Sequence, residues 1–123
     1  MSVSDRQKAD CERKSLRFLY SEETMTNEQF IADHYGIRNQ LKKLNEECFE
    51  LIEAVTTAET ARETTGDISG KMTMHICEEL ADCFVLMSQI RQHYGIEQGS
   101  ITKIYQQKIE RQLKRIEDET KRT

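Results

Sequence analysis

The sequence contains no proline and only five glycines among its 123 residues. These residue types interrupt helices and form turns, so their scarcity predicts a mostly helical chain with few turns. No pair of cysteines has the CxxC spacing, and the four cysteines follow no regular framework: Cys11, Cys48, Cys77 and Cys83. This usage favours free thiols in a reducing compartment over a disulfide-stabilised secreted scaffold.

The sequence also lacks a long apolar run and an excess of positive charge. No segment reaches the length of a membrane-spanning helix, and residues 1–14 are polar. The net charge of −4 argues against a broad basic surface for nucleic acid. We therefore expect a cytoplasmic protein that binds neither a membrane nor a nucleic acid polymer. A nucleotide ligand is compatible with this charge, because a bound cation reverses the charge locally.

The remaining pattern is that of one small helical domain. We predict a polar extension at 1–24, with its one apolar cluster at 16–20, followed by a helical domain at 25–123. Hydrophobic residues make up 37% of the chain and charged residues 33%, a balance typical of long amphipathic helices. Such helices bury more surface when two copies pair. The expected fold is all-α: an antiparallel bundle of about four main helices, completed by homo-oligomerisation.

Capping residues and glycines indicate where these helices begin and end. Thr26 or Asn27 is a candidate N-cap, and Gly36 and Gly95 are candidate ends. The segment 64–70 has turn chemistry, and Ser100 is a candidate N-cap of the last helix. The predicted helices are 27–35, about 37–62, about 71–94 and about 100–119.

The two middle helices carry the same arrangement of apolar and acidic residues. Each has an apolar stripe with a pair of acidic residues three positions apart along one edge. The stripes are Leu41, Leu44, Cys48, Leu51, Ile52 and Val55, and Met72, Ile76, Leu80, Cys83, Met87 and Ile90. The acidic pairs are Glu47 with Glu50 and Glu79 with Asp82.

Four carboxylates at the junction of two helices repel one another, and a hard divalent cation with oxygen ligands removes that cost. Mg²⁺ suits such a site, because it accepts a few carboxylates and also binds substrate phosphates. The ordinary alternative is a solvated acidic face, since pairs at this spacing are common on helix surfaces.

The last helix offers the opposite charge. Its apolar side consists of Ile101, Ile104, Tyr105, Ile109 and Ile116, and its basic flank of Lys108, Arg111 and Arg115. A basic edge in an acidic protein suits a polyphosphate ligand, although it is also explained by solvated charge and by pairing within the helix.

The segments EECFE at 46–50 and EELAD at 78–82 resemble the ExxE…ExxD signature of the all-α nucleoside triphosphate pyrophosphatases, and of the MazG-like branch most closely. In this resemblance Glu47, Glu50, Glu79 and Asp82 are the catalytic and metal-binding positions, with Mg²⁺ or Mn²⁺ as the cofactor. It implies substrate-binding roles for Gln40, Lys43, Lys108 and Arg111.

The resemblance further implies hydrolysis of a nucleoside triphosphate between the α and β phosphates, to a monophosphate and pyrophosphate, in a homodimer or homotetramer. Such an enzyme serves the clean-up or control of nucleotide pools. Two alternatives stay open at this point. One is a phosphoribosyl-ATP pyrophosphohydrolase of similar helical build, and the other is a non-catalytic helical interaction module.

Overall fold

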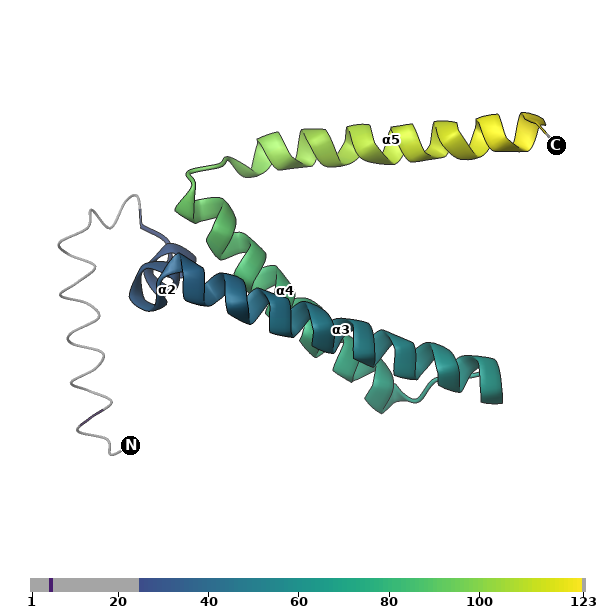
Figure 1. Cartoon of the computed structure of the whole chain (residues 1–123), viewed down its shortest axis with the longest axis horizontal. Coiled ribbons are helices and arrows are strands. Elements are labelled where there is room, and N and C mark those ends of the chain that lie inside the picture. Colours follow the sequence, from purple (N-terminus) through teal and green to yellow (C-terminus); the bar gives the residue numbers. More distant parts are fainter. Residues whose placement is uncertain (1–4, 6–24, 123) are drawn as a thin grey trace.

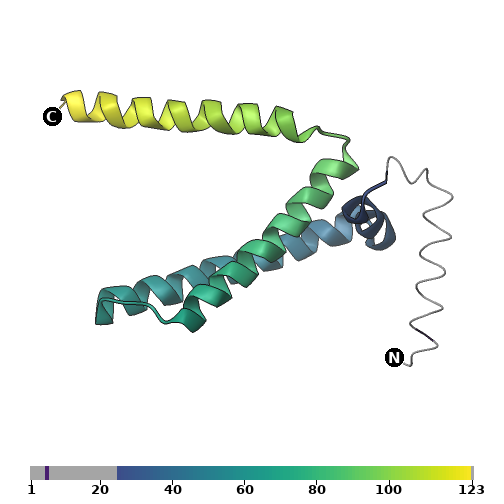
Figure 2. The same ribbon diagram turned by 180° about the vertical axis from the view of Figure 1, so that it is seen from behind.

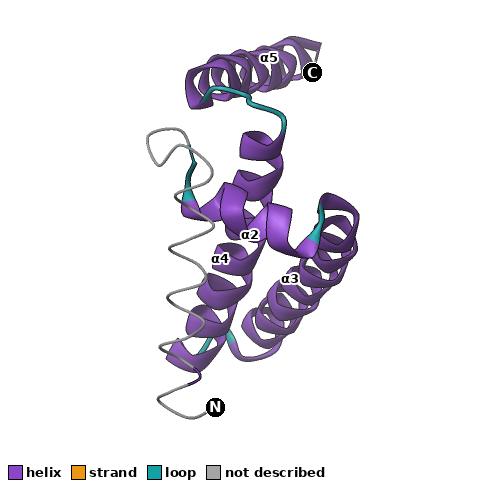
Figure 3. Cartoon of the chain, turned by 90° about the vertical axis from the view of Figure 1, so that its left-hand side faces the viewer, coloured by secondary structure: helices purple, strands orange, loops and turns teal. Residues whose placement is uncertain are grey.

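The computed structural model describes residue 5 and residues 25–122. In that part of the chain all regular structure is helical, which confirms the predicted all-α class with about four main helices (Figure 3). The four long helices are α2 (Asn27–Tyr35), α3 (Ile37–Thr65), α4 (Gly70–His93) and α5 (Gln98–Arg122). The predicted extension at 1–24, with its apolar cluster at 16–20, lies outside the described residues except for residue 5.

Side-chain caps and positive-φ glycines fix most of the helix ends. The Thr26 hydroxyl accepts the Gln29 N–H at 3.2 Å to open α2, and the Ser69 hydroxyl accepts the Met72 N–H at 3.2 Å to open α4. Gly36, with φ 87°, ends α2 where the sequence predicted. Such a φ is accessible to glycine at little steric cost.

Two predicted helix ends are wrong by a few residues. The second helix continues to Thr65, because Gly66 is the left-handed cap and donates its N–H to the Arg62 carbonyl at 2.8 Å. The last helix begins at Gln98, so Ser100 lies in its first turn and is not its N-cap. The connection between α3 and α4 is therefore only residues 66–69.

The packed part of the chain consists of α2, α3 and α4 (Figures 1 and 2). The chain turns back after α3, and α4 then lies along it while α2 packs against both. The buried apolar residues are mostly small, which lets the helices approach closely: Ala32, Ala54, Ala58, Cys83 and Leu86. The Thr26 hydroxyl also donates to the side-chain carbonyl of Gln92, which joins the start of α2 to the end of α4.

The predicted apolar stripes coincide only in part with the faces on which the helices meet. On α4, Cys83 of the stripe is buried, and it contacts Cys48 of the α3 stripe. Leu41, Ile52 and Val55 of α3 are exposed, by 47%, 63% and 44%, and Met87 of α4 by 48%. On α3 the buried residues are instead Gln40, Ala54 and Ala58, on the edge that also carries Glu47. The apolar band on α3 is wider than one partner helix covers, so α4 takes its small and acidic edge and the rest stays exposed.

Helix α5 leads away from this packed part of the molecule (Figures 1 and 2). None of its residues is buried, and its predicted apolar side is exposed along its whole length. No helix in the described part of the chain is long and apolar enough to span a bilayer.

Candidate metal centre

The two predicted acidic pairs lie on facing helices. Glu47 and Glu50 belong to α3, and Glu79 and Asp82 belong to α4. One carboxylate oxygen from each of Glu47, Glu50 and Glu79 lies within 4.8 Å of the other two. Asp82 is outside this group of three, but it is close enough for its charge to act on Glu47. The two helices thus bring three of the four predicted carboxylates together and leave the fourth beside them.

Two of these carboxylates lack hydrogen-bond partners for one of their oxygens. Glu79 is only 7% exposed, and Glu47 is half-buried. The Oε2 atoms of both are buried without a hydrogen-bond partner. Leaving such an acceptor buried and unpaired costs about 1–3 kcal/mol, and more when it is charged. A cation between the two helices would satisfy both atoms at once.

The electrostatics of the cluster favour a proton or a cation. Several causes together raise the pKa of Glu47 from 4.5 to about 7, and burial is the largest of them. The other causes are the charge of Glu50 and a hydrogen bond with it, the charge of Asp82, and a hydrogen bond with Glu79. A carboxyl group with such a pKa is partly protonated at neutral pH, and a divalent cation can displace that proton. The cluster offers only carboxylate oxygens. These are hard ligands, which bind Mg²⁺ or Mn²⁺ better than a soft metal.

Comparison with known families decides the class of this site. The family model of the MazG nucleotide pyrophosphohydrolase domain matches residues 36–116, about two thirds of the chain. The chain belongs to this family. The match confirms the resemblance drawn from the sequence and indicates a nucleotide pyrophosphohydrolase, which is a hydrolase. Metal dependence is general in the MazG family and agrees with the acidic cluster. No curated protein and no solved structure matches the chain.

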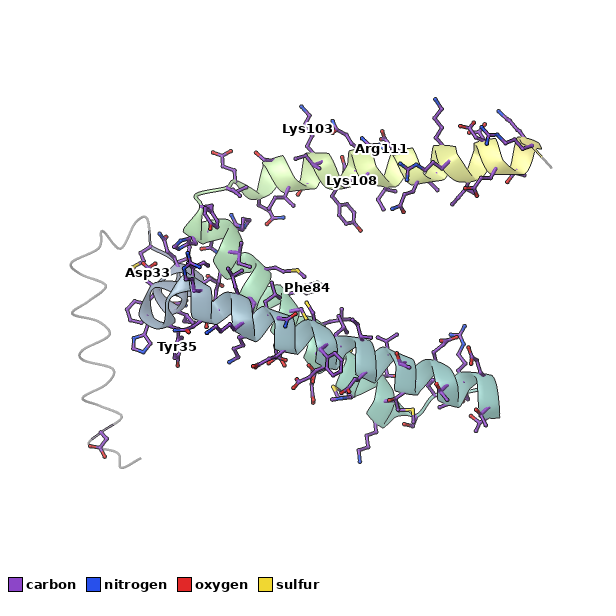
Figure 4. All side chains as sticks on the ribbon, in the orientation of Figure 1. Asp33, Tyr35, Phe84, Lys103, Lys108 and Arg111 are labelled. Atoms are coloured by element: carbon purple, nitrogen blue, oxygen red, sulfur yellow. The ribbon has the colours of Figure 1, made fainter. Side chains whose placement is uncertain are left out.

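The predicted substrate-binding residues of this MazG domain occupy different places. Lys43 is exposed on α3, one turn before Glu47 and on the same side of the helix. Lys108 and Arg111 are exposed on α5, which stands apart from α3 (Figure 4). In the described part of the chain, no ion pair joins either of them to the acidic cluster. Within a single copy, the basic edge and the acidic cluster are separate.

Gln40, a predicted substrate-binding residue, is buried and does not face solvent. It is 5% exposed and donates its amide N–H to the Oε1 of Gln89, which is 2% exposed, at 2.7 Å. The sequence analysis did not identify Gln89, because a polar residue on an apolar helix face carries no motif. It lies seven residues after Asp82, which is close to two helical turns, and this was the one available signal.

His75 is a second residue that the sequence analysis did not single out. Its Nδ1 lies 4.0 Å from Oε1 of Glu79 and 4.0 Å from Oε2 of Glu78. Residues 75, 79 and 82 follow one another at steps of four and three, so they form one row along α4. The spacing of His75 to the ExxD motif was therefore readable from the sequence.

Proposed function

We propose that this protein hydrolyses ribo- or deoxyribonucleoside triphosphates to a nucleoside monophosphate and pyrophosphate, in the clean-up or control of nucleotide pools. The observation that carries the proposal is the pair of orphaned carboxylate oxygens, from Glu47 and Glu79, inside a MazG domain. The catalytic unit is the helical domain at 25–123, and residues 1–24 are an extension outside it.

The four acidic residues would hold the metal: Glu47, Glu50, Glu79 and Asp82. A bound Mg²⁺, or Mn²⁺, supplies neutralisation of the phosphate charge and activation of a water for in-line attack at phosphorus. The protein itself keeps the carboxylates in place. Helices α3 and α4 are rigid elements, and they fix the spacing between these side chains. A glutamate of the cluster accepts the proton that the attacking water releases.

The basic residues would bind the polyphosphate. Lys43 lies on the same side of α3 as the acidic pair, so it is well placed to contact a phosphate at the metal. Lys108 and Arg111 would steady the charge on the leaving pyrophosphate. Gln40 would contact substrate only if its hydrogen bond with Gln89 opens, and its burial favours a role in aligning α3 with α4.

A second copy of the chain would complete the active site. Exposed apolar side chains remain on α3, on α4 and along α5. An antiparallel four-helix bundle made by two copies would cover the apolar faces of α3 and α4. Because Lys108 and Arg111 lie away from the acidic cluster of their own copy, we propose that α5 of the partner brings them there in a dimer or tetramer.

The test is pyrophosphate release from a panel of ribo- and deoxyribonucleoside triphosphates and phosphoribosyl-ATP, each with Mg²⁺ and with EDTA. The proposal expects metal-dependent release of pyrophosphate and a monophosphate from at least one nucleoside triphosphate. Turnover of phosphoribosyl-ATP alone would assign the protein to histidine biosynthesis instead. No turnover of any substrate by a folded, metal-bound protein would indicate a non-catalytic interaction module.

A further inference from the structure

The imidazole of His75 lies beside the acidic cluster, one turn before Glu79 on α4. Its side chain is 55% exposed, whereas that of Glu79 is only 10% exposed. The row formed by residues 75, 79 and 82 places His75 at the end of the cluster where α4 begins. Lys43 lies one turn before Glu47 on α3, and the chain turns back between α3 and α4 (Figure 1). Lys43 is therefore expected at the opposite end of the cluster.

The two carboxylate oxygens of Glu79 have different surroundings. Oε2 is buried and has no hydrogen-bond partner, whereas Oε1 faces Nδ1 of His75 at 4.0 Å. A carboxylate is planar, so a partner that holds one oxygen also sets the direction of the other. At 4.0 Å the imidazole is within ion-pair range of Oε1 but beyond hydrogen-bonding range, and a small movement of its exposed ring would bring Nδ1 into hydrogen-bonding contact.

We propose that His75 is a positioning residue of the metal centre, which closes on Oε1 of Glu79 when a cation binds and so fixes the carboxylate that the cation shares with Glu47. Outer partners of this kind orient the ligands of many protein metal sites. The neutral imidazole suffices for this role, because the tautomer protonated on Nδ1 donates one N–H to the carboxylate. The inference rests on the proposed function in one respect, namely that the cluster binds a divalent cation.

A histidine and a glutamate four residues apart on a helix surface usually contribute only about 0.2–0.5 kcal/mol of helix stability. Glu78 makes such an ordinary contact with the same Nδ1 atom, since its side chain is 66% exposed. Glu79 differs because it is buried, belongs to the acidic cluster, and has a second oxygen without a hydrogen-bond partner. A change at His75 should therefore act on metal affinity, with little effect on helix content.

The experiment measures the dissociation constant of Mn²⁺ in the absence of substrate, by isothermal titration calorimetry, for the full chain and its His75 variants. His75→Ala is expected to weaken Mn²⁺ binding by about 10–100-fold, the effect seen when such outer partners are removed. His75→Asn keeps a donor near the position of Nδ1 and should recover most of the affinity. His75→Gln places its donor near Nε2 and should recover less.

His93→Ala is the matched control, because His93 is an exposed histidine at the other end of α4. It should leave Mn²⁺ affinity at the wild-type value, and circular dichroism should show unchanged helix content in every variant. Wild-type Mn²⁺ affinity in His75→Ala would overturn the inference, as would equal losses in the Ala, Asn and Gln variants.

Failure of the inference can be distinguished from failure of the proposed function. If wild-type protein binds Mn²⁺ and the His75 series behaves as expected, the positioning role stands even when no nucleotide is hydrolysed. If nucleotides are hydrolysed but His75→Ala binds Mn²⁺ normally, only the positioning role fails. Wild-type protein that binds no Mn²⁺ would overturn both.

Discussion

Glu47 of α3 and Glu79 of α4 meet across the interface of their helices, within hydrogen-bonding range, and each keeps one buried oxygen without a partner. Joining two helices through a buried and a half-buried carboxylate is unfavourable, because each loses hydration and the two charges repel each other. Apolar residues at both positions would stabilise the fold better. The arrangement instead agrees with the metal dependence of the MazG family.

Conservative substitutions within the acidic pairs should remove activity and leave the fold intact. Glu50→Gln and Asp82→Asn keep the size of the side chain but remove the charge of one proposed metal ligand each. Because ligands of the metal matter at least as much as their outer partners, we expect each variant to lose about 100-fold or more of the metal-dependent hydrolysis rate. Steady-state kinetics and circular dichroism test this, and full turnover in either variant would contradict the site assignment.

The metal-free protein should become less stable as pH rises from about 5 to about 8. Burial and the neighbouring carboxyl groups raise the pKa of Glu47 to about 7 in the fold, against 4.5 ordinarily. Between these values the folded state binds more protons than the unfolded state, so its stabilising proton is lost as pH rises. Urea unfolding in EDTA at a series of pH values measures this slope.

Glu47→Gln is the control for that slope, because the amide does not titrate. The slope should be smaller in the variant than in the wild type, and saturating Mg²⁺ should weaken it in the wild type by replacing the proton. Equal slopes in wild type and variant would show that Glu47 does not titrate in this range.

The buried Gln40–Gln89 hydrogen bond should stabilise the packing of α3 on α4. Gln89→Leu leaves the Gln40 amide buried without its partner, which should lower the free energy of unfolding by about 1–3 kcal/mol. The double variant Gln40→Leu/Gln89→Leu removes both amides and should be more stable than the single variant. Urea unfolding of the three proteins decides this, and a double variant less stable than Gln89→Leu would contradict the account.

The basic residues of α5 should act on the acidic cluster of a partner copy. Lys108→Ala/Arg111→Ala should lower kcat/KM by about tenfold or more, because hydrogen bonds to charged phosphates are lost. Mixing this variant with Glu79→Gln should restore activity, since some sites then combine an intact cluster with an intact α5. Activity is measured after the two proteins are unfolded and refolded together.

The control mixture contains Lys108→Ala/Arg111→Ala and a protein that carries these changes together with Glu79→Gln. No pairing of copies in this mixture supplies Lys108 and Arg111, so no recovery is expected. Mixed oligomers that form in the test mixture but stay inactive at every ratio would place α5 on its own copy's cluster instead.

The sequence predicted the helices well where side chains act locally. Gly36 ends α2 as predicted, and the carboxylates at 47, 50 and 79 converge because i, i+3 spacing on two helices leaves little freedom. The end of α3 was predicted too early, because threonines 64 and 65 stay helical by bonding to carbonyls four residues back. Gly66 caps the helix because it adopts a positive φ, and the sequence alone does not show which residue will do so.

Packing was harder to predict than helix ends. Leu41, Ile52 and Val55 do lie on one apolar side of α3, but they are exposed. The residues that α4 buries on the neighbouring edge include Ala54 and Ala58. Periodicity identifies an apolar face but not which of several partners covers it. For the same reason, the basic flank of α5 was visible in the sequence, but its separation from the acidic cluster was not.

The most direct test of the central claim is a ³¹P NMR time course of a nucleoside triphosphate that the protein turns over, with Mg²⁺ present. The account predicts that the three triphosphate resonances are replaced by those of pyrophosphate and a nucleoside monophosphate, and that EDTA stops the change. Formation of a nucleoside diphosphate and inorganic phosphate, or turnover that persists in EDTA, would contradict it.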